Sequence, residues 1–254
     1  MSHPPAATRD EQMIVAAARA LRNGDVCFVG IGLPSKAANL ARLTHAPDVV
    51  LIYESGTIGA KPRALPLSIG DGELAATADA VVSIPEIFAY WLQAGRIDVG
   101  FLGAAQIDRF ANLNSTVIGD YEHPLTRLPG AGGAPEIAAQ AGEVFVMLRQ
   151  NVRAFVSRLD FITSAGYLDG GDSRQRLGFR GRGPTRVITD MGILTPSPGD
   201  NELQLTEMYH GVAVADVRAA TGWPLRADSR IRPIEPPSPL ELEALRSLAL
   251  SSPG

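Results

Sequence analysis

Residues 49–56 read Val-Val-Leu-Ile-Tyr-Glu-Ser-Gly, five apolar or aromatic residues followed by a carboxylate, a hydroxyl and a glycine. The apolar run is rich in β-branched side chains and predicts a fully buried strand. In an open α/β sheet, ligands bind beyond the carboxyl ends of the parallel strands. We therefore expect this strand to hold Glu54 at the edge of a crevice, where it can do chemistry. The alternative is that Glu54 simply begins a solvated loop.

Length and composition predict one large α/β domain over residues 1–254, with residues 1–7 as a loose tail. The chain is 45% hydrophobic, and its net charge of -4 argues against nucleic acid as a partner. We find no signal peptide or membrane-length apolar stretch, and the scattered histidines offer no metal-ligand spacing. The lone Cys27 lies in an apolar run and has no disulfide partner within the chain, which predicts a cytoplasmic location.

Alternating strands and helices in the first half of the chain predict a mostly parallel sheet with helices on both faces. Thr8 and Glu11 have the spacing of a capping box, which predicts the start of a helix. Gly30-Ile31-Gly32 is typical of a tight strand-to-helix turn, and an anion site at the helix N-terminus is the less favoured interpretation. We predict strands at residues 26–29, 49–53, 80–83, 98–103, 144–148, 161–164, 186–189 and 203–208, and helices at 36–43, 86–94, 215–221 and 238–248.

Three segments are expected to converge on one crevice: Glu54, the amide-rich residues 112–116 and the glycine-rich residues 130–134. Glycines that precede a helix expose backbone N–H groups, which can stabilise an oxyanion. A carboxylate nucleophile beside such donors is the minimal set for covalent acyl transfer. Ordinary turn chemistry explains the Asn and Ser residues of the second segment equally well.

Other polar residues have simpler interpretations. His123 precedes a proline and is better explained as a loop residue than as a general base. The four arginines of a glycine-rich segment predict a solvated or ion-paired loop, and an anionic ligand is the second interpretation because arginine pairs well with carboxylate and phosphate. These arginines are Arg174, Arg176, Arg180 and Arg182.

Five motifs together resemble the β subunit of family I CoA-transferases, in the glutaconate CoA-transferase-like branch that also holds the 3-oxoadipate CoA-transferases of aromatic degradation. The similarity runs from Asn23 to Trp223 and is specific for the family more than for the acyl group. Ala111 departs from the pattern, which has glycine before Asn112. The motifs are YESG at 53–56, GAAQID at 103–108, NLNST at 112–116, IGDY at 118–121 and GAGGA at 130–134.

The resemblance implies a NagB/RpiA/CoA-transferase-like fold and a catalytic glutamate at Glu54. It also implies an α subunit as partner, coenzyme A as a substrate with no separate cofactor, and CoA transfer through a glutamyl-CoA thioester. Small dicarboxylic acyl groups are the expected substrates, with succinyl-CoA as donor and 3-oxoadipate as acceptor. The predicted oxyanion- or substrate-binding residues are Ser55, Gly56, Gln106, Asn114, Ser115, Gly132 and Gly133.

Three alternatives to this reaction stay open. The first is a glutaconate-type transferase of the same branch. The second is a CoA-ester hydrolase on the same scaffold, in which Glu54 activates water as a general base. The third is a non-catalytic ligand-binding subunit, since one fold can host unrelated functions. The acidic strand tip argues against the third alternative, because a sensor needs no nucleophile.

Overall fold

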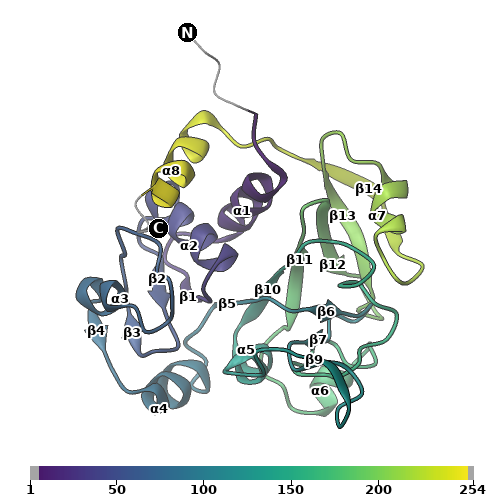
Figure 1. The fold of residues 1–254 in the computed structure, drawn as a ribbon, viewed down its shortest axis with the longest axis horizontal. Coiled ribbons are helices and arrows are strands. Elements are labelled where there is room, and N and C mark those ends of the chain that lie inside the picture. Colours follow the sequence, from purple (N-terminus) through teal and green to yellow (C-terminus); the bar gives the residue numbers. More distant parts are fainter. Residues whose placement is uncertain (1–5, 251–254) are drawn as a thin grey trace.

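The computed structural model describes residues 6–250, with side chains through Leu248, and is built around a ten-stranded sheet (Figure 1). Two separate two-stranded sheets cover residues in the middle of the chain: β6 (Gln106–Ile107) with β7 (Leu113–Asn114), and β8 (Val117–Gly119) with β9 (Pro124–Arg127). In spatial order the large sheet consists of β14 (Arg226–Ile234), β13 (Leu203–Tyr209), β12 (Gly192–Pro196), β11 (Pro184–Ile188), β10 (Glu143–Met147), β5 (Val99–Leu102), β1 (Val26–Phe28), β2 (Val50–Ile52), β3 (Thr57–Ile58) and β4 (Ala80–Val81).

The centre of the large sheet is parallel, which confirms the predicted fold class. Strands β2, β1, β5, β10 and β11 all run in one direction, and Cys27 of β1 pairs with Leu51 on one side and Val99 on the other. Strands β3, β4 and β12 are antiparallel to their neighbours. The apolar runs of the central strands are buried on both faces, as a parallel sheet covered by helices requires.

Helices cover both faces of the sheet, because successive strand residues point to opposite sides. Cys27 and Leu51 pack with one set of helices, and their neighbours Phe28 and Ile52 pack with the other. The first set is α1 (Arg9–Ala20), α2 (Leu33–Leu43) and α8 (Pro239–Leu250), and the second is η1 (Ile87–Leu92), α5 (Ala134–Gln140) and α7 (Val214–Ala219). The remaining helices are α3 (Gly72–Thr77), α4 (Ile84–Glu86) and α6 (Ser173–Arg176). No helix among residues 6–250 is both long and apolar enough to span a bilayer.

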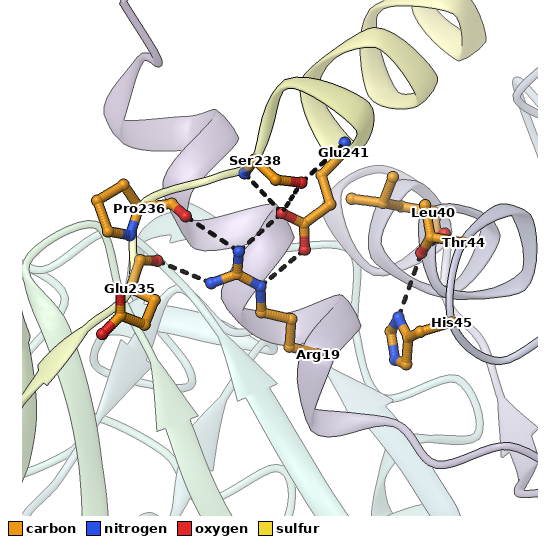
Figure 2. A network of polar contacts seen from close by, with 8 residues as sticks. All are labelled: Arg19, Leu40, Thr44, His45, Glu235, Pro236, Ser238 and Glu241. Atoms are coloured by element: carbon orange, nitrogen blue, oxygen red, sulfur yellow. Dashed lines mark hydrogen bonds and ion pairs between the residues drawn. The ribbon is translucent and has the colours of Figure 1, made fainter.

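A polar clamp fastens the C-terminal helix α8 to α1 (Figure 2). The Arg19 guanidinium donates two hydrogen bonds of 2.7 Å to the Glu241 carboxylate, and it also donates to the carbonyl oxygens of Glu235 and Pro236. The backbone N–H and hydroxyl of Ser238 donate to the same carboxylate at 2.7 Å. The clamp joins segments near the two ends of the chain: Arg19 and Glu241 are 222 positions apart in sequence.

The structure corrects several predicted elements. Residues 161–164 form no strand; the segment bonds to Leu113 of β7 through an isolated bridge at Ser164 and through the Thr163 N–H. The predicted strand at residues 203–208 is present as β13, but the strands on either side of it in the sequence, β12 and β14, are not predicted. Residues 86–94 form no continuous α-helix, since the segment changes from α4 to the π-helix η1 at Ile87.

Other expectations at the N-terminus hold. The capping box is present, with the Thr8 N–H donating to Glu11 at 2.8 Å and the Glu11 N–H donating to the Thr8 hydroxyl at 3.2 Å. Cys27 is fully buried, as its apolar flanks predict. Of the predicted tail, residues 1–5 lie outside the described residues.

Candidate active site

A cavity of about 410 Å³ lies beyond the carboxyl ends of β1, β2 and β5. Its walls are mainly apolar side chains and exposed backbone, and Glu54 is the carboxylate in its lining. The turn at Gly30 and Ile31, interpreted from sequence as a plain strand-to-helix turn, is part of the wall. The lining residues are Phe28, Val29, Gly30, Ile31, Pro34, Glu54, Ile69, Phe101, Leu102, Gly103, Ala104, Ala105, Ser115, Leu128, Pro129, Gly130, Ala131, Gly132, Gly133, Ala134 and Ile137.

The backbone beside Glu54 is held from behind by Tyr53. The Tyr53 ring is fully buried, and its hydroxyl lies 3.1 Å from the Ser35 hydroxyl and accepts from the Asn39 amide at 3.4 Å. Both partners belong to α2, so the strand tip is fixed to the neighbouring helix. The Glu54 carboxylate itself has no hydrogen-bond or ion-pair partner among residues 6–250. A rigid backbone thus presents a half-exposed, unpaired carboxylate to the cavity.

The glycine turn lies directly against this carboxylate. A Cβ atom built on Gly132 would lie 3.8 Å from both Glu54 carboxylate oxygens, and one built on Gly133 would lie 3.2 Å from Oε1. Gly132 has a φ of +48°, a conformation that favours glycine. The N–H groups of Gly132 and Gly133 donate a hydrogen bond to no group among the described residues. The structure therefore brings Glu54 together with two free backbone donors, the arrangement that oxyanion stabilisation needs.

Ser115 holds the start of this turn in place. Its hydroxyl donates to the Gly130 carbonyl at 2.8 Å, and the Gly130 N–H donates back to the Ser115 carbonyl at 2.8 Å. The Ser115 N–H in turn donates to the Thr163 hydroxyl at 2.9 Å. Ser115 lines the cavity, but its hydroxyl and carbonyl groups bond to the turn and its N–H bonds to Thr163.

Gln106 and Asn114 are not among the residues that line the cavity. Both are buried and bonded to each other, with the Asn114 amide donating to Gln106 Oε1 at 2.7 Å. Gln106 also donates to Asp160 at 2.8 Å, and Asn114 donates to the Val117 carbonyl at 2.6 Å. A buried amide must satisfy its own donors and acceptor, and here the neighbouring strands do so. In this chain the two amides therefore bond within the fold and lie outside the lining of the cavity that holds Glu54.

Ser55 and Gly56 are not among the residues that line the cavity. The Ser55 hydroxyl is buried and has no hydrogen-bond partner among the described residues. Gly56 has a φ of +107°, and a Cβ there would lie 2.0 Å from the carbonyl oxygen of Val82. Only glycine fits this close approach, so Gly56 serves the turn between β2 and β3. The structure places both residues next to Glu54 in sequence but not in the lining.

The remaining polar candidates are structural or solvated. His123 is exposed and lies 3.5 Å from the Asp120 carboxylate. Arg174 is buried, and its guanidinium donates to four backbone carbonyl oxygens, those of Ala165, Gly166, Ala138 and Gly181. Burial lowers the pKa of Arg174. Both terminal nitrogens of the Arg174 guanidinium thus bond to backbone carbonyls. The donor that remains for an anionic ligand is its buried Nε.

Ala111 adopts a backbone conformation that glycine adopts more readily. Its φ is +56°, in the left-handed region that disfavours a side chain, and it is fully buried. The following Asn112 compensates with a dense set of bonds: its amide donates to Asp108 and to the Leu168 carbonyl, each at 2.9 Å. The loop keeps its shape at some cost in backbone strain.

A parallel α/β sheet that presents a free carboxylate beside a glycine turn at its strand ends is consistent with the class of protein that the comparisons identify. The chain belongs to the coenzyme A transferase family, whose model matches residues 10–220. It is 63% identical over 239 residues to the β subunit of 3-oxoadipate CoA-transferase from Pseudomonas knackmussii, covering 94% of this chain and 92% of the relative.

Two further comparisons agree with this assignment. The chain is 37% identical over 246 residues to the β subunit of glutaconate CoA-transferase from Acidaminococcus fermentans, covering 94% of this chain and 91% of the relative. The crystal structure of glutaconate coenzyme A-transferase from that organism superposes with a TM-score of 0.89 at 35% identity, over 94% of each chain. The predicted family and its fold are thereby confirmed.

Proposed function

We propose that this chain is the β subunit of an enzyme that moves CoA from succinyl-CoA to 3-oxoadipate, together with an α subunit. The observation that carries the proposal is the unpaired Glu54 carboxylate beside the Gly132–Gly133 turn. It stands in a chain that is 63% identical to the β subunit of a 3-oxoadipate CoA-transferase. This identity supports 3-oxoadipate as the CoA acceptor more strongly than the 37% identity to a glutaconate CoA-transferase subunit supports glutaconate.

The proposed reaction uses Glu54 as a covalent nucleophile. Its carboxylate attacks the thioester carbonyl of the donor. The C–S bond breaks, CoA thiolate is released, and an acyl-glutamyl anhydride forms on Glu54. The thiolate then attacks the Glu54 carbonyl carbon, which releases the donor acid and forms a glutamyl-CoA thioester. The acceptor carboxylate attacks this thioester, and the same two steps run in reverse to deliver the new acyl-CoA.

The residues of this chain supply two physical contributions to these steps. Every step passes through a tetrahedral oxyanion, and we assign its stabilisation to the free N–H groups of Gly132 and Gly133 in the turn beside Glu54. The apolar walls, including Phe28, Phe101 and Ile137, keep water from competing with carboxylate and thiolate. A carboxylate that is a poor nucleophile in water becomes effective in such a site.

The competing functions differ in what they predict for free CoA. A hydrolase that uses Glu54 as a general base releases CoA to water without an acceptor, whereas a transferase needs a second carboxylate. A non-catalytic subunit does neither. The 63% identity to a named CoA-transferase subunit supports the transferase over the hydrolase and over the non-catalytic subunit.

A substrate panel tests the proposal. The chain, copurified with its α subunit, is assayed with succinyl-CoA, acetyl-CoA and glutaryl-CoA as donors against 3-oxoadipate, glutaconate and acetate as acceptors. We expect the highest kcat/KM for succinyl-CoA with 3-oxoadipate, and no turnover when the acceptor is omitted. A higher kcat/KM with glutaconate, or CoA release at full rate without acceptor, would overturn the assignment.

A further inference from the structure

The π-helix η1 stands beside the glycine turn. Its backbone bonds span five residues: the Gln93 N–H donates to the Phe88 carbonyl at 2.8 Å, and the Arg96 N–H donates to the Trp91 carbonyl at 2.9 Å. Such single π-turns are rare and occur frequently at functional sites. In this π-helix the side chain of Phe88 lies against Gly133 of the turn beside Glu54.

Phe88 and Glu54 meet at Gly133 from two sides. A Cβ built on Gly133 would lie 2.6 Å from Phe88 Cζ and 3.2 Å from Glu54 Oε1. The position that a Gly133 Cβ would take therefore lies between the Phe88 ring and the Glu54 carboxylate. It is too close to the ring to hold a water molecule. The ring also packs against the cavity-lining Phe28, with centroids 5.8 Å apart.

A second contact couples η1 to the helix that begins at the turn. The Gln93 side chain donates to the Glu136 carboxylate at 2.8 Å, and Glu136 lies in the first turn of α5. The Arg180 guanidinium donates to the Gln93 carbonyl at 2.9 Å, which closes the C-terminal end of the π-helix. Phe88 and Gln93 thus hold α5 at two points, one at Gly133 and one at Glu136.

We propose that Phe88 is a positioning residue, which holds Gly133 against Glu54 and excludes water from that side of the carboxylate. The proposal rests on the proposed function and adds the residue that favours transfer over hydrolysis. A glutamyl-CoA thioester is open to water, whose attack breaks the C–S bond and returns the Glu54 carboxylate and free CoA thiol. An aromatic ring at this place leaves no room for that water beside the carbonyl.

The test compares Phe88→Leu and Phe88→Ala with the control Phe155→Leu, each in the assembled α/β enzyme. Phe155 is a fully buried phenylalanine that stacks on Trp223, in the hydrophobic cluster against which Phe88 packs. Unlike Phe88, it is not among the groups nearest to a Cβ on Gly133. All three variants lose aromatic packing, so each is expected to lower the melting temperature. Only the Phe88 variants are expected to lower kcat, by about 10- to 100-fold for Phe88→Ala, because a displaced donor costs catalysis at that scale.

The ratio of CoA hydrolysis to CoA transfer is the readout that a structural role alone would not change. It is measured with donor acyl-CoA in the presence and absence of acceptor. We expect the ratio to rise severalfold in Phe88→Ala, less in Phe88→Leu, and to stay at the wild-type value in Phe155→Leu. An unchanged ratio and kcat in both Phe88 variants, in an enzyme that loads CoA onto Glu54, would overturn this inference alone. Absence of CoA loading in the wild type would instead overturn the proposed function.

Discussion

At the residue scale, Gly133 has the less room for a side chain of the two glycines in the turn beside Glu54. A side chain at Gly133 meets Phe88 at 2.6 Å and Glu54 Oε1 at 3.2 Å, so it must displace one of them. We predict that Gly133→Val lowers kcat by about 100-fold or more, the scale of losing one oxyanion donor. Steady-state kinetics of the assembled enzyme measure this effect.

Gly72 is a matched control for this substitution. A Cβ on Gly72 meets nothing within 4 Å, and the residue is the first of α3. Gly72→Ala is expected to retain wild-type kcat and assembly. Near-normal turnover of a correctly assembled Gly133→Val enzyme would show that the turn does not stabilise the oxyanion.

The same scale shows what can be predicted from sequence about the site. The strand-tip position of Glu54 and the glycines of the turn follow from local patterns, and the structure places them together. Gln106 and Asn114 have the right chemistry but satisfy each other, and pairing between β6 and β7 cannot be inferred from residue type. Phe88 escapes prediction because an aromatic residue at helical spacing indicates only core packing.

At the element scale, the clamp on α8 predicts a pH-dependent stability. Burial opposes ionisation of Glu241, but hydrogen bonds from Arg19 and Ser238 outweigh it and lower its pKa from 4.5 to about 2. A lowered folded-state pKa stabilises the protein above the unfolded value, and this contribution is lost as the pH falls toward 2. We predict that Glu241→Gln costs about 1–2 kcal/mol in the free energy of unfolding at pH 7.

Denaturant melts between pH 7 and pH 3 test this prediction. The difference between wild type and Glu241→Gln is expected to shrink steadily below pH 4.5. Glu243→Gln is the control, because Glu243 is exposed on the same helix and its side chain makes no described bond. A constant difference across this range, or an equal effect in the control, would contradict the role given to the clamp.

Elements differ in how far local sequence predicts them. The central strands β1, β2 and β5 are apolar runs, and the sequence predicts them within one or two residues. The edge strand β14 escapes prediction because it is rich in arginine and mostly exposed, and an edge tolerates charge and proline. Residues 161–164 look like a strand, but Phe161 stacks on Tyr121 instead of joining a ladder.

At the scale of the whole molecule, the cavity is open and large apolar side chains stand exposed near it. Ile69 lines the cavity and is 40% exposed, and Leu67, two residues before it, is 68% exposed. We predict that the chain alone has no transferase turnover and gains it on mixing with an α subunit. Obligate interfaces of this kind typically bury about 2,000 Å² or more.

Analytical ultracentrifugation and an activity titration test this prediction together. Activity is expected to rise with added α subunit and to saturate at the stoichiometry of the complex seen in sedimentation. Leu67→Asp is expected to weaken the complex without changing the fold of the isolated chain. Full turnover by the purified single chain would show that the site is complete without a partner.

The central claim is that Glu54 carries CoA covalently. The assembled enzyme is incubated with succinyl-CoA without acceptor, and peptides spanning residue 54 are analysed by mass spectrometry before and after borohydride reduction. We expect CoA on Glu54, its reduction to an alcohol with irreversible loss of activity, and neither event in Glu54→Gln or with free succinate. Release of free CoA at full rate, with no adduct on Glu54 in the wild type, would contradict the account.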